Sequence, residues 1–162
     1  MSPTDRPLQT ATYDHVALSV GDLEAMVGFY TRLGFDEITC VDFAPAPVHL
    51  AVLANSAGTR LELTVHDSSS PAAATGPLDA ARRRGPFHFS LRVDRLIETV
   101  PRCQAAGARV VTAPALNSRG DGTFAYIADP EGNLIELVAS STVSRSRNDR
   151  RPSQPHPTTT LS

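Results

Sequence analysis

The stretch TFAYIADPEGNLIEL at residues 123–137 decides the fold, because it has a counterpart earlier in the chain. The counterpart is HLAVLANSAGTRLEL at residues 49–63, which lies 74 residues before it. Further out, HFSLRVDRLIETVPRCQAAGARVV at residues 88–111 repeats HVALSVGDLEAMVGFYTRLGFDEI at residues 15–38 with an offset of 73. The chain therefore contains two similar halves, with one residue inserted between the two registers.

Hydrophobic periodicity predicts the same order of elements in both halves. Alternating apolar residues are typical of strands with one buried face, and apolar residues at intervals of three and four are typical of helices. The first half is predicted to have strands at 15–20, 35–41, 48–53 and 60–65 and a helix from an Asp22 cap to Gly34. The second is predicted to have strands at 87–93, 109–112, 124–128 and 134–138 and a helix from an Asp94 cap to Gly107, kinked or starting late at Pro101. Each half is thus a βαβββ module, and the fold class is α+β.

The chain is expected to form a single domain at residues 12–140. Its parts are module one at 13–66, a linker at 67–85 and module two at 86–140. The linker is rich in Ser, Pro and Ala, and a short helix is expected within it around residues 78–84. Residues 1–11 are predicted to be a flexible leader and residues 141–162 a disordered tail, because they offer too few apolar side chains to offset the entropy of ordering.

Composition excludes several classes of function. The net charge is −2 and the arginines are spread along the chain, so we expect no nucleic-acid partner. No apolar run is long enough for a membrane span or a signal peptide, which predicts a soluble, cytoplasmic protein without a membrane partner. All 15 basic residues are arginine, which excludes Schiff-base chemistry and a lysine general base. Cys40 and Cys103 are expected to be small buried residues in a reducing compartment.

Four residues at matched positions of the two modules are the candidates for chemistry. Each module begins with a histidine, His15 or His88, and closes with a glutamate inside an apolar strand, Glu62 or Glu136. Strand alternation places all four opposite the apolar faces, toward a concavity. Two buried carboxylates without a cation would be costly, whereas a divalent metal accepts two imidazoles and two carboxylates. The sequence therefore predicts a metal site with these four ligands.

Three motifs, HVALSVGDLEAMVGFYTRLGF from His15, HFSLRV from His88 and DPEGNLIELV from Asp129, resemble the vicinal oxygen chelate superfamily over residues 13–139. This superfamily includes glyoxalase I, epimerases, extradiol dioxygenases and bleomycin-resistance-type binding proteins. The resemblance implies two tandem βαβββ modules forming a cup-shaped, partly closed mixed β-sheet with helices on the outside. It also implies a homodimer, a small-molecule substrate, and the four ligand candidates holding a divalent ion (zinc, nickel, cobalt, manganese or iron), with no organic cofactor.

The function that this resemblance favours is a metal-dependent epimerase or isomerase, or a glyoxalase-type lyase. It would act on a small 2-hydroxycarbonyl compound through a metal-bound enediolate, with Glu62 and Glu136 as the catalytic residues that move protons on opposite faces of the substrate. Lactoylglutathione lyases carry an arginine shortly before the first histidine and an asparagine after the first glutamate. This chain has neither at residues 11–13 or 64–66, which argues against glutathione. A sugar-like or cyclitol ketone is one candidate substrate.

Two alternatives stay open. An extradiol-type dioxygenase normally uses two histidines and one glutamate, so that Glu62 fits this class less well. A metal-free, antibiotic-sequestering binding protein generally lacks the ligands altogether. The sequence does not decide between these enzyme classes, and it leaves open whether one chain supplies the whole metal site or a dimer shares it.

Overall fold

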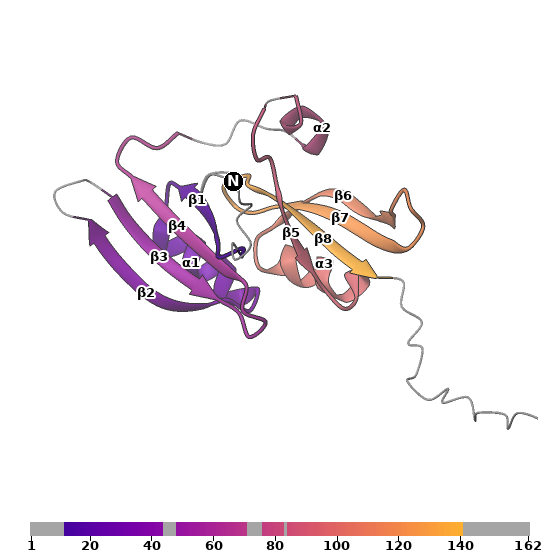
Figure 1. Cartoon of the computed structure of the whole chain (residues 1–162), viewed down its shortest axis with the longest axis horizontal. Helices are drawn as coiled ribbons and strands as arrows, with labels where there is room; N and C mark the ends of the chain where they lie inside the picture. Colours follow the sequence, from indigo (N-terminus) through magenta and orange to yellow (C-terminus); the bar gives the residue numbers. More distant parts are fainter. Residues whose placement is uncertain (1–11, 44–47, 71–75, 83, 141–162) are drawn as a thin grey trace, which may run out of the picture.

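The computed structural model describes residues 12–43, 48–70, 76–82 and 84–140, which form two modules joined by a linker (Figure 1). Module one consists of β1 Val16–Val20, α1 Leu23–Arg32, β2 Asp36–Phe43, β3 Val48–Ala54 and β4 Arg60–His66. The linker contains the short helix α2 Pro77–Ala80, close to where a helix was expected. Module two consists of β5 Phe89–Arg92, α3 Leu96–Ala105, β6 Arg109–Leu116, β7 Gly122–Ala128 and β8 Leu134–Ser140. The predicted leader and tail lie outside the described residues.

Each module forms its own four-stranded mixed sheet. The strand order is β1-β4-β3-β2 in module one and β5-β8-β7-β6 in module two. In both sheets the first strand pairs parallel with the last, and the remaining neighbours are antiparallel. The α+β class and the two βαβββ modules are confirmed, and the described strands form two sheets without a closed barrel.

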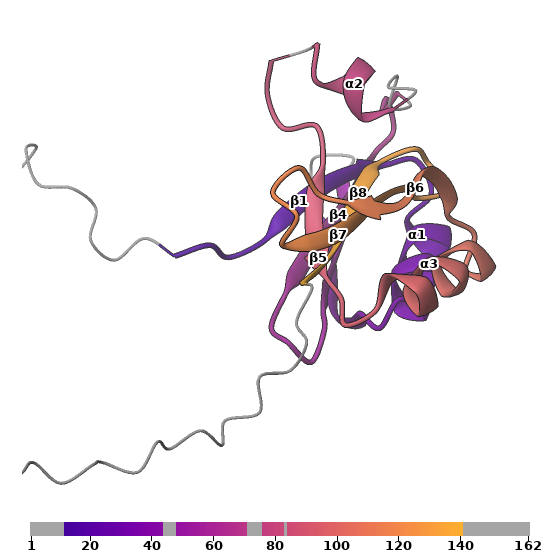
Figure 2. The same ribbon diagram turned by 90° about the vertical axis from the view of Figure 1, so that its right-hand side faces the viewer.

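The helices α1 and α3 lie next to each other on the same side of the two sheets (Figure 2). Their apolar residues, together with those of the strands beneath them, belong to one continuous core that spans both modules. Fully buried members include Met26 and Phe29 of α1, Leu63 of β4 and Ile135 of β8. No helix of the described residues covers the opposite side of each sheet, and Glu62 and Glu136 are found there. None of the helices in the described segments is long and apolar enough to cross a membrane.

Helix α1 begins and ends as its sequence predicts. The Asp22 side chain accepts a hydrogen bond from the backbone N–H of Ala25 at 2.9 Å, which satisfies one of the free amide groups of the first turn. The helix stops before Gly34, whose φ of 92° lies in the left-handed region that glycine adopts without strain.

The predicted start of α3 is wrong. Arg95, not Asp94, is the N-cap, and it makes no side-chain capping bond. The helix also starts before Pro101 and continues through it, so the late start that this proline suggested does not occur. Proline removes the donor that would bond to the carbonyl of Ile97, but Ile97 is 71% exposed, and water can satisfy that carbonyl.

The strands of module two differ in length from the prediction, and β5 and β6 differ most. Strand β5 starts only at Phe89, whereas β6 runs on to Leu116, past the expected end at Thr112. The pairing of β6 with β7 shifts between Thr112 and Ala115, so Pro114 falls in an irregular part of an edge strand. Proline is tolerated there because its missing N–H is not needed for pairing.

The expectation that both cysteines are buried is half right. Cys103 of α3 is buried, but Cys40 of β2 is exposed. Among the described strands β2 is an edge strand that pairs with β3 alone, and its residues 36–42 are all exposed. The pattern of apolar residues in the sequence does not distinguish an exposed edge strand from a strand that is buried beneath a helix.

The turn DPEGN forms the predicted hairpin and also connects the two modules. The backbone N–H of Asp129 donates to the carbonyl of Asn133 at 3.0 Å, and Gly132 has a φ of 92°. The buried Asp129 carboxylate accepts a hydrogen bond from the hydroxyl of Tyr30 in α1 at 2.9 Å. Glu131 accepts from the backbone N–H groups of Gly21 and Asp22 at 2.7 and 2.8 Å. Module two thereby contacts both the start and the C-terminal part of the helix of module one.

Candidate functional site

In module one, the parallel pairing of β1 with β4 brings His15 close to Glu62. Ala17 is paired with Glu62, and His15 stands two residues before it on the same face. The distance from His15 Nε2 to Glu62 Oε2 is 3.9 Å. The other ring nitrogen, Nδ1, lies 2.8 Å from an oxygen of Asp14. This second contact orients the imidazole so that Nε2 points toward the glutamate.

The carboxylate of Asp14 is held in its charged form by its neighbours. The hydrogen bond to His15, followed by the charge of Arg60, lowers the pKa of Asp14 below its usual value. Arg60 Nη1 lies 3.3 Å from Asp14 Oδ1. Histidine ligands of metals usually donate their second N–H to a carboxylate of this kind. Sequence reasoning missed Asp14, although its place directly before His15 was a visible signal.

In module two, the same arrangement brings His88 close to Glu136. Strand β5 pairs with β8 so that Ser90 is opposite Glu136, and His88 stands two residues earlier. His88 Nε2 is 3.5 Å from Glu136 Oε2, and the hydroxyl of Ser90 donates to the same oxygen at 2.5 Å. The Nδ1 atom of His88 is buried and has no hydrogen-bond partner in the described part of the chain.

Aromatic side chains enclose the histidine of module two. The rings of Phe87 and Tyr126 meet His88 edge to face, with centroids 4.4 and 5.4 Å away. Tyr126 is the antiparallel partner of Glu136 on β7. Burial and then the negative charge of Glu136 raise the pKa of the Tyr126 hydroxyl. Sequence reasoning did not single out Tyr126, because only the strand pairing shows that it adjoins Glu136.

Both glutamates lie on the side of the sheet away from the core, as the alternation predicts. Leu61 and Leu63, the neighbours of Glu62, are 0% exposed, whereas the Glu62 side chain is 29% exposed. The neighbours of Glu136 are likewise buried and its side chain is 23% exposed. The two modules therefore present equivalent histidine–glutamate pairs on their open faces.

The structure does not bring all four candidates together in one chain. Within the described residues, no three His, Cys, Asp or Glu side chains lie close enough together to hold a metal ion. A hollow of about 410 Å³ between β1 and the start of β5 includes His88 in its lining, but no carboxylate. We call the two pairs half-sites: His15 and Glu62 form half-site one, and His88 and Glu136 form half-site two.

The donors of the half-sites fit a divalent cation in type but not in number. Each half-site offers one imidazole and one carboxylate, whereas zinc in proteins takes three or four protein ligands. Neither glutamate forms an ion pair with an arginine of the described segments, so both carboxylates are available to a cation. The two half-sites together would supply the complete set that the sequence predicts.

Comparison with known proteins agrees with this architecture. A family model described as Glyoxalase/Bleomycin resistance protein/Dioxygenase superfamily matches residues 12–137. A probable lactoylglutathione lyase of Vibrio cholerae is 29% identical over 128 residues, which cover 76% of this chain and 87% of that protein. The crystal structure of a glyoxalase family protein from Enterococcus faecalis has a TM-score of 0.67 at 18% identity, covering 80% of this chain and 98% of that one. A bleomycin-binding protein crystallised with bleomycin has a TM-score of 0.55 at 27% identity, covering 80% and 99%.

Proposed function

The chain belongs to the glyoxalase/bleomycin resistance protein/dioxygenase superfamily, and we propose that it is a metal-dependent glyoxalase-type lyase or isomerase of a small 2-hydroxycarbonyl compound. The observation that carries the proposal is the repetition of one histidine–glutamate pair on the open face of each module. The names of its relatives, probable lactoylglutathione lyases, support the lyase class.

We propose further that two copies of the chain assemble the complete site. Half-site one of one copy would face half-site two of the other, so that a dimer holds two sites. The separation of the half-sites within the chain supports this arrangement. The outer strands also expose apolar side chains that a second copy would cover, among them Ile38 of β2 at 58% and Leu116 of β6 at 71%.

In such a site His15, Glu62, His88 and Glu136 would hold the cation. A divalent cation there would supply Lewis acidity, stabilising the negative charge that develops on the oxygens of the substrate. The chain itself supplies the proton transfers. Glu62 and Glu136 come from opposite modules, so one carboxylate can remove a proton from the carbon beside the carbonyl while the other returns one. Tyr126 and Phe87 exclude water around His88.

Glutathione is not the thiol that the proposal favours. The positions that serve it in lactoylglutathione lyases hold Ala, Thr and Tyr before His15 and Thr, Val and His after Glu62. Of the three residues that precede His15 in this comparison, Tyr13 is the nearest to it in sequence, and its side chain is 75% exposed. A hydroxyketone that needs no thiol partner agrees better with these residues.

Metal-dependent proton exchange is the expected result that tests the function. The full-length protein is stripped with a chelator, reloaded with zinc, nickel, cobalt, manganese or iron, and incubated in heavy water with a panel of hydroxyketones. Deuterium should enter the carbon beside the carbonyl about 100-fold faster with metal than without, as measured by NMR. The hemithioacetal of methylglyoxal and glutathione is assayed in parallel and should be the poorer substrate.

The control for this experiment is His15→Ala, which should bind no stoichiometric metal and catalyse no exchange. If the wild-type protein binds no metal and His15→Ala changes nothing, the proposal is wrong. Oxygen uptake with a catechol and ferrous iron would assign the protein to the dioxygenases. The likeness to the bleomycin-binding protein supports a second candidate, sequestration of an antibiotic, and metal-independent binding of bleomycin without exchange would favour it.

A further inference from the structure

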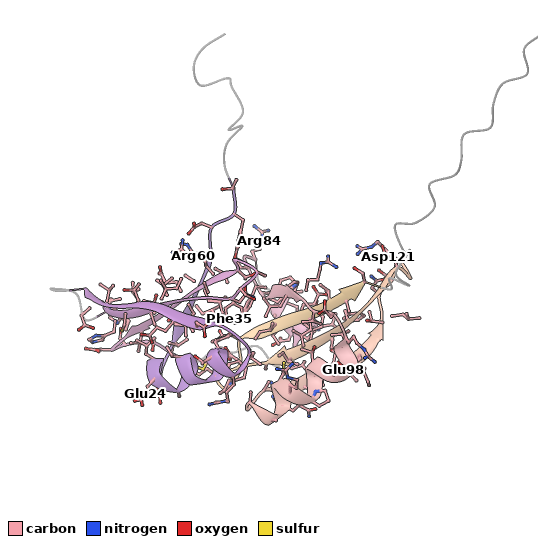
Figure 3. The ribbon with its side chains drawn as sticks, turned by 90° about the horizontal axis from the view of Figure 1, so that it is seen from below. Glu24, Phe35, Arg60, Arg84, Glu98 and Asp121 are labelled. Atoms are coloured by element: carbon pink, nitrogen blue, oxygen red, sulfur yellow. The ribbon has the colours of Figure 1, made fainter. Side chains whose placement is uncertain are left out.

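The open face of module two contains a hollow of about 610 Å³ that starts at Glu136 and extends to the turn between β6 and β7. Its lining includes Ser90, Arg92, Arg119, Tyr126, Glu136 and Ser140. Asp121, another lining residue, lies on the side of the sheet away from α3, where Figure 3 labels it opposite Glu98. Half-site two therefore opens directly into a polar hollow.

Arg92 is the residue of this hollow whose positive charge is available to a negatively charged ligand. It follows His88 and Ser90 on the same face of β5, and its strand partner is Val138, two residues beyond Glu136. Two residues of a strand span about 7 Å, which sets the distance between Arg92 and the glutamate along the sheet. Its Nη1 donates to the hydroxyl of Ser140 at 2.8 Å, and no carboxylate of the described segments forms an ion pair with it.

The second arginine, Arg119, is held at the far rim of the hollow. Its Nε lies 3.3 Å from Asp121, which also accepts a hydrogen bond from Asn117 at 2.7 Å. Asp121 thus neutralises Arg119 and positions it, while Arg92 keeps its positive charge free. With a cation on Glu136, the hollow would be positively charged at the end where the reaction takes place.

The duplication provides an internal comparison, because each residue of module two has a counterpart in module one. At the offset of 73, Arg92 corresponds to Ser19. At the offset of 74, Tyr126 corresponds to Val52, which is the strand partner of Glu62. The histidine–glutamate pair is thus the same in both modules, but the matched positions of module one hold Ser19 and Val52 in place of the arginine and the tyrosine.

We propose that this hollow binds an oxyanion on the non-reacting part of the substrate, with Arg92 as its principal ligand. The inference rests on the proposed function and narrows its substrate class to hydroxycarbonyl compounds that carry a carboxylate or a phosphate. The guanidinium group binds both oxyanions through paired hydrogen bonds, and Ser140 already fixes one side of it. Arg92 lies two strand residues, about 7 Å, beyond the position opposite Glu136, so the oxyanion would be carried on a part of the substrate close to the reacting carbon.

The test compares three probes that share a hydroxyketone and differ in charge. Dihydroxyacetone phosphate carries a phosphate, 5-hydroxy-4-oxopentanoate carries a carboxylate, and dihydroxyacetone carries neither. Their dissociation constants are measured on the full-length protein by calorimetry and ligand-detected NMR, with and without bound metal. The wild-type protein should bind at least one charged probe about tenfold more tightly than the neutral one. Whichever charged probe binds more tightly identifies the oxyanion.

Two variants of Arg92 and one control variant test whether Arg92 causes the preference for charged probes. Arg92→Met should lose about tenfold in affinity for the charged probe and keep its affinity for dihydroxyacetone, and Arg92→Lys should keep part of the gain. Ser19→Ala, the matched change in module one, should alter neither. Circular dichroism checks that each variant is folded.

The inference is overturned if the wild-type protein binds charged and neutral probes equally, or if Arg92→Met binds the charged probe as well as the wild type does. Metal binding is measured separately on every variant. Absence of metal from the wild-type protein would contradict the proposed function, while the arginine dependence in the metal-free samples would still decide the inference.

Discussion

Glutamine in place of Glu136 is expected to leave a folded protein that no longer binds metal and has lost about 1000-fold in turnover. The amide has nearly the shape of the carboxylate, but it carries no charge for a cation and cannot accept a proton. Glu136 lies 3.5 Å from His88 Nε2 on the open face of its sheet, so its replacement leaves the core intact. Metal binding is measured by calorimetry and turnover by the exchange assay.

The matched control for Glu136→Gln is Glu98→Gln. Glu98 is an exposed glutamate of α3, on the helix side of the molecule (Figure 3), and it forms an ion pair with Arg95. This change removes the same charge far from both half-sites and should leave metal binding and turnover unchanged. If Glu136→Gln still binds the metal with wild-type affinity, Glu136 is not a ligand.

Mixed dimers of two inactive variants test whether each site is shared between two copies of the chain. If the half-sites meet between copies, a dimer of one Glu62→Gln chain and one Glu136→Gln chain contains one intact site and one doubly defective site. Mixed dimers, co-expressed with two different tags and purified on both, should recover about half of the wild-type turnover per dimer, because half of the sites are intact. If isolated mixed dimers remain inactive, each site takes its four ligands from one chain.

Alanine in place of Asp129 is expected to destabilise the protein by about 3 kcal/mol or more. The Asp129 residue is 3% exposed, and its carboxylate accepts four hydrogen bonds. The donors are the Tyr30 hydroxyl, the backbone N–H groups of Glu131 and Asn133, and the Asn133 side chain. Alanine would leave these groups without their partner in a largely buried site. The free energy of unfolding in urea measures the loss.

Tyr30→Phe is the companion variant, since it removes one hydrogen bond between the modules and leaves the bonds within the turn in place. Its expected cost is about 1 kcal/mol, a fraction of the cost of Asp129→Ala. Burial raises the pKa of Asp129, although the four hydrogen bonds lower it. The unfavourable desolvation of the carboxylate therefore offsets part of the stabilisation that the hydrogen bonds provide. If Asp129→Ala unfolds within about 1 kcal/mol of the wild type, the turn does not hold the modules together.

Most helix ends and turns were predicted correctly because they are determined by residues close together in the sequence. The Asp22 cap, the stops at Gly34 and Gly107 and the DPEGN turn depend on residues a few positions apart, and all are found in the structure. Errors arose where distant neighbours decide. Cys40 is exposed because β2 lies at the edge of its sheet, and β6 continues past Pro114 because no described strand pairs on its outer side.

The candidate site was predictable to the same extent. Alternation decides on which side of a strand a residue lies, so the placement of Glu62 and Glu136 on the open faces followed from the sequence. It does not decide how two sheets are placed relative to each other, and the separation of the half-sites became visible only in the structure. Tyr126 was missed for a related reason, since its contact with His88 depends on strand pairing.

The order in which the chain is synthesised gives the bond between Glu131 and α1 a further consequence. The amide groups of Gly21 and Asp22 find their carboxylate partner more than 100 residues later, while the equivalent turn of module one has Ala57 and offers no carboxylate to α3. A nascent chain that has only module one outside the ribosome must leave these amides to water. The residues that lead into the helix of the first half therefore gain these two bonds only after Glu131 has emerged, so the final structure of the first half depends on the second.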